Sequence, residues 1–353
     1  MSSQLKLKDF DFQLPESLIA QKPLATRDQS KLMVLDRKSG SIKHEIFSRL
    51  PHLIPQQSLM VFNNTKVIPS KLYGYQVKNK IPVEILLLRE TTGKNKWEAL
   101  IKGLSKIRLE TEMEFGSGKL KAVLKDRLEN KAILELQYHG KLDNILNQIG
   151  EMPLPPYIRR KTNGDKRISD QDRERYQTVF ASLPGAIAAP TAGLHFTPRI
   201  IKSLNKKGID TMYLTLHVGI GTFQPIRVEN IIEHKMQPEQ FYIPEETSKA
   251  LINARGKLKK IVGIGSTVTR VLESVKLDHL HPSGTEGWTN RFIYPGSKFI
   301  VVDHLLTNFH LPKSTLYLLV CAFAGKKLTT EAYKEAILEK YRFFSYGDAM
   351  LII

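Results

Sequence analysis

The sequence predicts an α/β protein with a mixed, mostly parallel sheet, barrel-like in parts, and a small all-β, barrel-like domain inserted into it. Strand–loop–helix units recur after residue 151, a pattern typical of a sheet covered by helices. Between residues 70 and 151 the chain shows only short alternating strands separated by turn signals such as Gly116-Ser117-Gly118, as in small barrels or sandwiches. We therefore expect an α/β domain of residues 1–69 plus 152–353 and an inserted β domain of residues 70–151.

The first seventy residues are predicted to supply an edge strand, one helical turn and three further strands. The alternating Asp-Phe-Asp-Phe run at 9–12 favours the edge strand, and residues 16–20 favour the helical turn. Residues 31–36 and 41–47 form a predicted hairpin around Ser39-Gly40, and residues 59–63 form the next strand. In the inserted domain the expected strands are 71–76, 82–89, 97–101, 119–125 and 131–138.

A βαβ unit is predicted at the centre of the remaining chain. Residues 186–189 are small and apolar, which suits a buried strand. Thr197 is placed to cap a helix, Pro198 fits its first position, and the helix ends near Gly208. Residues 209–218 then have strand character. The loop inside this unit carries polar residues at the place where open α/β sheets bind ligands.

Further units are expected on both sides of this centre. Residues 172–180 have helical polarity, and the strand 260–264 leads into a helix that contains Thr269 and Val275. The strand 298–302 is predicted to lead into a helix over 314–324. Thr329 or Thr330 is expected to cap a last helix that runs to about Tyr341, and a final strand closes the chain within 343–353.

Charge and cysteine content bound the function. The chain has 53 Lys and Arg against 35 Asp and Glu, a net charge of +18, which favours nucleic acid first and an anionic membrane second as partner. A single cysteine excludes an intrachain disulfide and a cysteine zinc site. The first residues lack a signal peptide and no apolar run is long enough to span a bilayer. We expect a cytoplasmic protein, monomeric and without a membrane partner.

Four loops collect polar residues that are able to move protons and to grip a carboxylate. They span 191–197, 217–223, 307–312 and 342–348. No P-loop, complete dinucleotide fingerprint or metalloprotease motif is present, and the histidine spacing does not favour a metal. If the loops converge, one pocket holds His195, His217, His310, Arg342, Tyr346 and Asp348.

At these loops the chain resembles a known family. The motifs that carry the resemblance are Asp11-Phe-Gln-Leu-Pro15, Phe62-Asn-Asn-Thr65, Pro155-Pro-Tyr-Ile158, Arg175-Tyr-Gln-Thr-Val-Phe180, Ala189-Pro-Thr-Ala-Gly-Leu-His-Phe-Thr197, His217-Val-Gly-Ile-Gly-Thr-Phe223, Thr307-Asn-Phe-His-Leu-Pro312 and Tyr341-Arg-Phe-Phe-Ser-Tyr-Gly-Asp-Ala-Met350. In this combination and order they resemble the S-adenosylmethionine:tRNA ribosyltransferase-isomerases of queuosine biosynthesis, nearly from end to end. Lys66 and Lys71 stand where that family more often has arginine, which removes bidentate phosphate binding.

The resemblance implies both a fold and a reaction. The fold is a mixed α/β domain with an inserted β domain. The reaction transfers and isomerises the ribosyl group of S-adenosylmethionine onto 7-aminomethyl-7-deazaguanine at the tRNA wobble position, and it gives epoxyqueuosine-tRNA, adenine and methionine. S-adenosylmethionine is then a co-substrate, with no permanently bound cofactor and no metal. The alternative is an RNA-binding module without catalysis, which explains the charge but leaves the glycine- and histidine-bearing loops without a purpose.

Roles are assigned to the loop residues as hypotheses. His195 is the first choice for the general base, because the helix that starts after it lowers its pKa; its alternative is a purely hydrogen-bonding role. His310 and Asp348 follow as proton carriers. Residues expected to bind the cofactor are Thr191, Gly193, Phe196, His217, Gly219, Gly221, Thr222, Asn308, Arg342 and Tyr346, with Arg342 on a ligand carboxylate. Residues expected to contact tRNA are Lys66, Lys71, Arg159, Arg160, Lys161 and Arg167.

Overall fold

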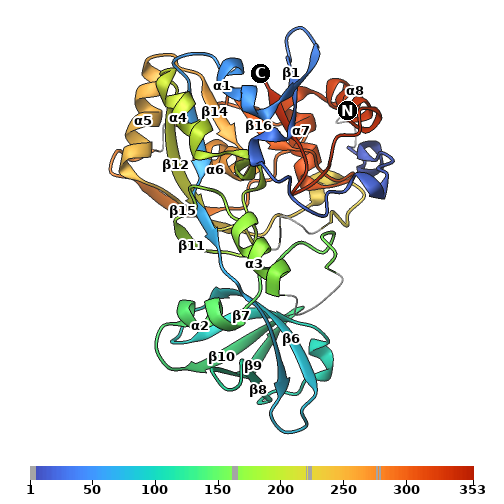
Figure 1. Ribbon diagram of the computed structural model, residues 1–353, viewed down its shortest axis with the longest axis vertical. Coiled ribbons are helices and arrows are strands. Elements are labelled where there is room, and N and C mark those ends of the chain that lie inside the picture. The colour runs from blue at the N-terminus through green and yellow to red at the C-terminus, as the bar shows by residue number, and fades with distance from the viewer. Residues whose placement is uncertain (1–4, 161–165, 220, 222–224, 276, 278–279) are drawn as a thin grey trace.

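The computed structural model describes residues 5–353 except 161–165, 220, 222–224, 276 and 278–279. An α/β body occupies the upper part of Figure 1 and a closed barrel the lower part, with helix α3 (Lys166–Arg175) between them. Among the described residues, no helix is long and apolar enough to cross a membrane. The predicted α/β class with an all-β barrel is confirmed.

The body is built on a nine-stranded sheet in the order β15-β13-β12-β3-β14-β16-β17-β1-β2. β12, β3, β14 and β16 are mutually parallel, as are β17 and β1, and the other neighbours pair antiparallel. The sheet is therefore mixed, with a parallel centre. The strands are β1 (Lys31–Leu35), β2 (Ile42–Ile46), β3 (Leu59–Asn63), β12 (Asp210–Leu216), β13 (Glu239–Ile243), β14 (Ile261–Ile264), β15 (Thr285–Thr289), β16 (His304–Asn308) and β17 (Ala349–Ile352).

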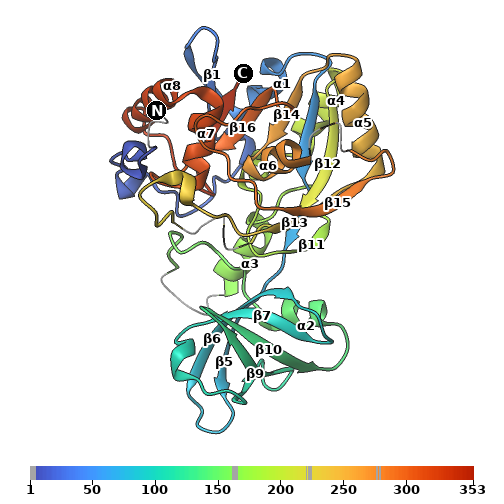
Figure 2. The same ribbon diagram turned by 180° about the vertical axis from the view of Figure 1, so that it is seen from behind.

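Helices cover both faces of this sheet, as predicted. Alternate residues of a strand point to opposite faces, so Leu59 and Val61 of β3 join one core cluster while Met60 and Phe62 join another. The first cluster also contains residues of α5 (Glu245–Gly256), α6 (Ser266–Val275), α7 (Thr315–Ala324) and α8 (Lys326–Leu338), and Figure 2 shows α5, α6 and α7 on this side. The second contains residues of α1 (Leu50–Leu53) and α4 (Pro198–Lys206).

The inserted segment forms a closed barrel in the order β10-β7-β6-β5-β8-β9. The strands are β5 (Lys71–Gln76), β6 (Pro82–Glu90), β7 (Lys96–Ile101), β8 (Glu112–Phe115), β9 (Leu120–Leu128) and β10 (Lys131–Tyr138), followed by α2 (Leu142–Ile149). β8 and α2 were not predicted. The chain enters and leaves the barrel at Lys71 and Glu151, whose backbones exchange hydrogen bonds of 3.2 and 2.8 Å. On that ground we propose domain junctions at residues 70 and 151.

The helix start in the central unit is confirmed, but its first strand is not where the sequence predicted it. Thr197 caps α4, accepting a hydrogen bond from the Ile200 N–H at 3.3 Å, and Pro198 is its first residue. The strand before it is β11 (Leu183–Ala186), which pairs with β4 (Thr65–Val67) outside the main sheet. The predicted strand at 186–189 and the βαβ unit within one sheet are therefore wrong. A run of small apolar residues does not specify its strand partner.

Two more predicted strands are wrong for long-range reasons. Residues 298–302 form no strand, because the N–H groups of Ile300, Val301 and Val302 donate to the buried Glu273 carboxylate at 2.9–3.0 Å. The strand is instead β16, which begins at His304. Residues 9–12 were predicted as an edge strand, yet Leu7–Phe10 forms a 3₁₀ turn that buries Phe10.

Two helix boundaries also differ from the prediction. The last helix begins at Lys326 after Gly325, whose φ of 86° is favourable for glycine, and not at Thr329 or Thr330. Thr329 lies inside the helix and its hydroxyl donates to the Gly325 carbonyl at 2.9 Å. The helix expected at 172–180 is α3, which ends at Arg175.

Candidate active site at the carboxyl edge of the parallel strands

The motif loops meet along one edge of the sheet. β12, β3, β14 and β16 run parallel, so their carboxyl ends share that edge. Asn308 at the end of β16 pairs with Ala349 at the start of β17, so the loop 342–348 arrives there too. β3 continues through β4 into the barrel, so this edge faces the barrel (Figure 1). Ligands of open α/β sheets bind in this position.

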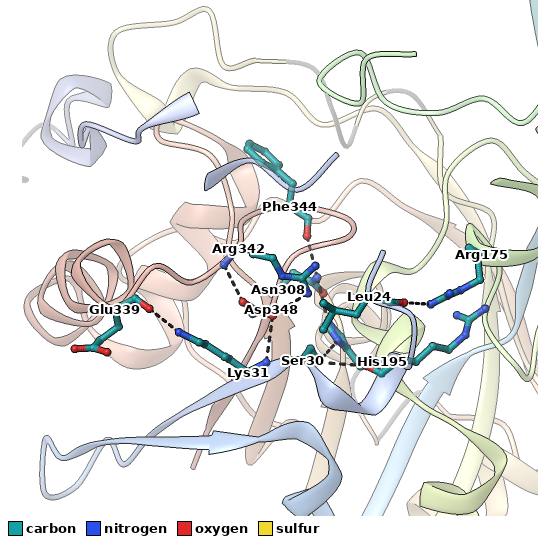
Figure 3. A network of polar contacts seen from close by, with 11 residues as sticks. Leu24, Ser30, Lys31, Arg175, His195, Asn308, Glu339, Arg342, Phe344 and Asp348 are labelled. Carbon is teal, nitrogen blue, oxygen red and sulfur yellow. Dashed lines mark hydrogen bonds and ion pairs between the residues drawn. The ribbon is translucent and has the colours of Figure 1, made fainter. Parts of the chain in front are cut away.

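His195 lies at the β16 end of the edge and is 4% exposed. Its Nδ1 is 2.7 Å from the Ser30 hydroxyl, and its Nε2 is 3.3 Å from the amide nitrogen of Asn308. Its ring stacks on Phe47 with centroids 5.0 Å apart. Figure 3 shows the imidazole held between Ser30 and Asn308. Both ring nitrogens are therefore engaged inside the protein.

The hydrogen-bond chain around His195 assigns its tautomer. The Asn308 amide nitrogen donates one hydrogen to the Phe344 carbonyl at 3.0 Å and turns the other toward His195 Nε2. Nε2 is thus an acceptor, and Nδ1 carries the proton that it donates to Ser30. The Ser30 hydroxyl in turn donates to the Arg27 carbonyl at 3.4 Å. The chain is satisfied only by a neutral imidazole.

The pKa of His195 agrees with this neutral state. Burial, then the charges of Arg342 and Arg27, lower the pKa from 6.5 to about 3, although the bond to Asn308 opposes them. The direction is the one that the sequence predicted, but the main cause is burial and not the start of α4. A group that weakly basic is poorly matched to proton abstraction near neutral pH.

His310 lies away from His195. The His310 Nε2 is 2.8 Å from the Thr307 hydroxyl, and the backbone N–H of His310 donates to the Tyr333 hydroxyl at 3.0 Å. Thr307 and Asn308 are successive residues of a strand and point to opposite faces. Because Asn308 turns toward His195, the structure does not bring His310 into the same group. Burial lowers the pKa of His310 to about 3.

Asp348 is buried and fully used by its neighbours. Its carboxylate accepts hydrogen bonds from the Lys31 N–H at 3.1 Å and the Arg342 N–H at 2.8 Å, and it pairs with Arg342 Nη2 at 3.0 Å. These three donors leave it poorly placed to take a proton from a ligand. Asp348 instead fixes Arg342 at the edge (Figure 3).

A small pocket opens beside His195. Arg27, Arg175 and Arg342 line it together with Tyr346, and no acidic side chain is among its described lining residues. We call it the arginine pocket. It brings together three of the predicted site residues, His195, Arg342 and Tyr346, and it is positively charged.

His217 lies at the other end of the edge. It follows β12, three strand spacings from β16, or about 14 Å. Its Nδ1 is 2.8 Å from the Thr65 hydroxyl, whereas no described residue hydrogen-bonds its Nε2. Gly185 permits close approach of the ring, since a Cβ there would lie 2.8 Å from His217 Cε1. Burial lowers the pKa of His217 from 6.5.

His217 lines a cleft between body and barrel with a volume of about 970 Å³. Arg89 and Trp97 of the barrel line one side, and Gly219 and Trp288 of the body line the other. The predicted loops thus contribute to two hollows on one edge, the cleft and the arginine pocket, and not to one. In the described part of the chain no group of three or more His, Cys, Asp or Glu side chains is placed to hold a metal.

A buried ion pair positions the glycine loop that follows His217. The Gly219 N–H donates to Glu239 at 2.9 Å, and the other Glu239 oxygen pairs with Arg270. The side chains of Glu239 and Arg270 are only 4% and 3% exposed. Arg270 also donates to the Arg291 carbonyl at 2.9 Å. The pair is therefore a rigid support for the loop.

Several predicted cofactor residues face the protein interior. A Cβ on Gly193 would lie 2.8 Å from Thr178 Cγ2 and 2.9 Å from Phe180 Cζ, so this glycine admits neighbouring side chains. Phe196 is fully buried against Phe47, Phe62 and Phe180. We therefore expect Gly193→Val to destabilise the fold, since the valine side chain would clash with Thr178 and Phe180.

The other members of the predicted cofactor set are scattered or outside the description. Thr191 starts the 3₁₀ turn that ends at His195 and is half-buried. Gly221 packs beside Gln237, whose Cβ would be 3.2 Å from an added Cβ. Thr222 lies outside the described residues.

The predicted tRNA contacts divide into exposed and internal residues. Lys66 is exposed, Lys71 pairs with Glu84 at 2.9 Å, and Arg159 pairs with Glu16 at 2.6 Å. Arg160 is committed inside the protein, because it bridges both Asp172 oxygens at 2.6–2.8 Å and the Gln21 carbonyl at 2.8 Å. Lys161 lies outside the described residues, as does the side chain of Arg167. Phosphate binding by the exposed members stays a prediction.

Sequence reasoning missed Arg27, Ser30, Arg175, Thr65 and Glu239. For two of them a signal was present. Arg175 opens one of the motifs that carry the family resemblance, and Thr65 ends another. Arg27 and Ser30 directly precede β1, whose first residues reach the same edge. Glu239 gave no local signal, because its role depends on the distant Arg270.

Comparisons with known proteins agree on one family. A family model described as queuosine biosynthesis protein matches residues 7–352. The S-adenosylmethionine:tRNA ribosyltransferase-isomerase of Halothermothrix orenii is 47% identical over 350 residues, which covers 99% of this chain and 100% of the relative. That of Natranaerobius thermophilus is 46% identical, with 99% of each chain covered. The crystal structure of S-adenosylmethionine tRNA ribosyltransferase from Thermotoga maritima is 36% identical, with a TM-score of 0.56 and 98% and 100% covered.

Proposed function

The chain belongs to the queuosine biosynthesis protein family, and we propose that it acts as an S-adenosylmethionine:tRNA ribosyltransferase-isomerase at the carboxyl edge of its sheet. The ribosyl group of S-adenosylmethionine is transferred and isomerised onto 7-aminomethyl-7-deazaguanine at the wobble position of a tRNA. S-adenosylmethionine is consumed as a co-substrate, and no permanently bound cofactor takes part. The enzyme works as a monomer in the cytoplasm, where its tRNA is found.

The observation that carries the proposal is the setting of His217. The Thr65 hydroxyl holds its Nδ1, while no described residue bonds its Nε2, and the residue lines the cleft between body and barrel. The cleft, at about 970 Å³, is large enough for a nucleoside and a flipped base together. Burial lowers the pKa of His217, so the imidazole is neutral near pH 7 and can accept a proton.

The chemistry needs such a group. A base removes a proton from the 5′ carbon beside the sulfonium, which acidifies that position, and adenine then leaves. The amine of the deazaguanine attacks the sugar, and an epoxide closes as methionine leaves. We assign the proton transfer to His217 in preference to His195, whose two ring nitrogens are both engaged. His195, Asn308 and Asp348 are positioning residues, which hold the neighbouring loops and Arg342 in place.

The positive charge of the chain suits its second substrate. A net charge of +18 attracts the tRNA phosphates and steers association. The exposed residues Lys66 and Arg159, with Lys71 at the junction, are proposed phosphate contacts. The cleft lies between the body and the barrel, and a tRNA bound to these residues would contact both.

The test is product formation with defined tRNA. With S-adenosylmethionine and tRNA that carries 7-aminomethyl-7-deazaguanine, we expect adenine, methionine and modified tRNA in equal amounts. The matched control is the same tRNA with guanine at the wobble position, which lacks the nucleophilic amine and should give no modified tRNA. Tight tRNA binding without adenine release would contradict the proposal and favour a binding module.

A further inference from the structure

The arginine pocket concentrates positive charge that the protein itself does not neutralise. Arg27 and Arg175 have no carboxylate within 4.0 Å among the described residues, and only Arg342 has such a partner, Asp348. The charge of Glu174 acts on Arg27 beyond ion-pair distance, so three guanidinium groups face two carboxylates and positive charge remains in excess. The pKa of Arg27 is lowered by burial and then by the charge of Arg175.

Backbone carbonyls hold two of these guanidinium groups in place. Arg27 donates to the Leu194 and Glu174 carbonyls, each at 3.1 Å. Arg175 donates to the Leu24 and Ala25 carbonyls at 2.7 and 3.3 Å. Carbonyl oxygens orient an arginine but do not cancel its charge. The Nε of Arg175 is buried and has no hydrogen-bond partner in the described part of the chain.

We propose that the arginine pocket binds a ligand oxyanion, either a carboxylate or a phosphate. Grouping like charges in a half-buried site costs free energy, and a bound anion offsets that cost by attracting the guanidinium groups. Arginine is the side chain that best matches the two oxygens of a carboxylate or phosphate. The pocket is small, and it suits a single carboxylate or phosphate group and not a whole nucleoside.

The identity of the ligand rests on the proposed function. One source is the carboxylate of the methionine part of S-adenosylmethionine. The other is a phosphate of the tRNA. The pocket lies beside His195 and Asn308, at the β16 end of the edge, whereas His217 and the cleft lie at the β12 end. An extended S-adenosylmethionine with its carboxylate among the arginines would run along the edge toward the cleft.

The experiment measures binding by calorimetry with matched ligands and variants. Wild-type enzyme should bind S-adenosylmethionine about 10–100-fold more tightly than decarboxylated S-adenosylmethionine, since a charged hydrogen bond contributes about 1.5–3 kcal/mol. In Arg175→Gln and in Arg27→Gln this preference should vanish. Arg173→Gln is the control, because Arg173 lies on the same helix and also donates to backbone carbonyls, those of Asn147 and Gly150, outside the pocket.

A second arm distinguishes a phosphate. If wild-type enzyme binds the two ligands equally, but Arg175→Gln reduces the salt slope of tRNA binding by about 0.7–0.9, the oxyanion is an RNA phosphate. The proposal is overturned if Arg175→Gln and Arg27→Gln, melting like wild type, change neither the ligand preference nor the salt slope. Inorganic phosphate and L-methionine serve as probes that do not depend on turnover. If either probe binds in an arginine-dependent way to an enzyme that releases no adenine, the proposal of an oxyanion site holds and the proposed reaction is contradicted.

Discussion

Replacing His217 by alanine is expected to slow single-turnover adenine release by about 10²–10⁴-fold with tRNA saturating, the usual effect of removing a general acid or base. The chain should still fold, because among the described residues the His217 side chain hydrogen-bonds only Thr65, and it lines an open cleft. The measurement is a rapid-quench time course of adenine. Burial lowers the pKa of His217, and its base form is lost as pH falls through that pKa. The acid limb of the wild-type rate should therefore lie below pH 6.5.

His195→Ala is the contrasting variant. It removes the stacking on Phe47 and takes one hydrogen-bond partner from Ser30 and one from Asn308, which keep only their bonds to the Arg27 and Phe344 carbonyls. We expect it to lower the free energy of unfolding by about 1–3 kcal/mol, the cost of unsatisfied buried polar groups, with a smaller effect on the chemical step. A large loss of rate in His195→Ala at unchanged stability, with full activity in His217→Ala, would return the base to His195.

Arg270→Met is expected to lower the free energy of unfolding by about 3–5 kcal/mol, because it leaves the Glu239 carboxylate buried without its cation. Both side chains are at most 4% exposed, so solvent does not replace the lost partner. Chemical denaturation measures the effect. The control is Lys249→Met, which breaks an exposed pair with Glu245 on α5 and should leave stability unchanged within error.

The double replacement Arg270→Met with Glu239→Leu separates stability from function. Stability should recover in part, since an apolar pair can replace a buried ion pair without net loss. Activity should not recover, because the Gly219 N–H loses the Glu239 oxygen that holds it at 2.9 Å. Equal stability of Arg270→Met and wild type would show that the ion pair does not support the glycine loop.

The parts of the fold that local chemistry specifies were predicted well. The start of α4 follows from the capping hydroxyl of Thr197 and the ring of Pro198. The first and last residues of β3, β5 and β10 were predicted correctly, β3 from its apolar run and the other two from alternating residues between turn signals. The prediction failed where a distant side chain hydrogen-bonds the backbone. The N–H groups of Val301 and Val302 donate to Glu273 of α6, and no strand forms there.

The candidate site was predicted to a similar extent and for the same reason. Glycines and histidines in loops after strands marked the carboxyl edge correctly. The arginine pocket could not be read from the sequence, because it assembles Arg27, Arg175 and Arg342 from three distant segments. The preference for His195 over His217 also depended on partners that only the fold reveals, namely Ser30 and Asn308.

The central claim is that S-adenosylmethionine binds along the carboxyl edge of the parallel strands, between the arginine pocket and the cleft. Amide hydrogen exchange with and without S-adenosylmethionine tests it directly. We predict slower exchange in peptides that cover 191–196, 215–219 and 342–348, and unchanged exchange in α5, which packs on one face of the sheet. Protection confined to the barrel strands or to α5, with those three segments unchanged, would contradict the claim.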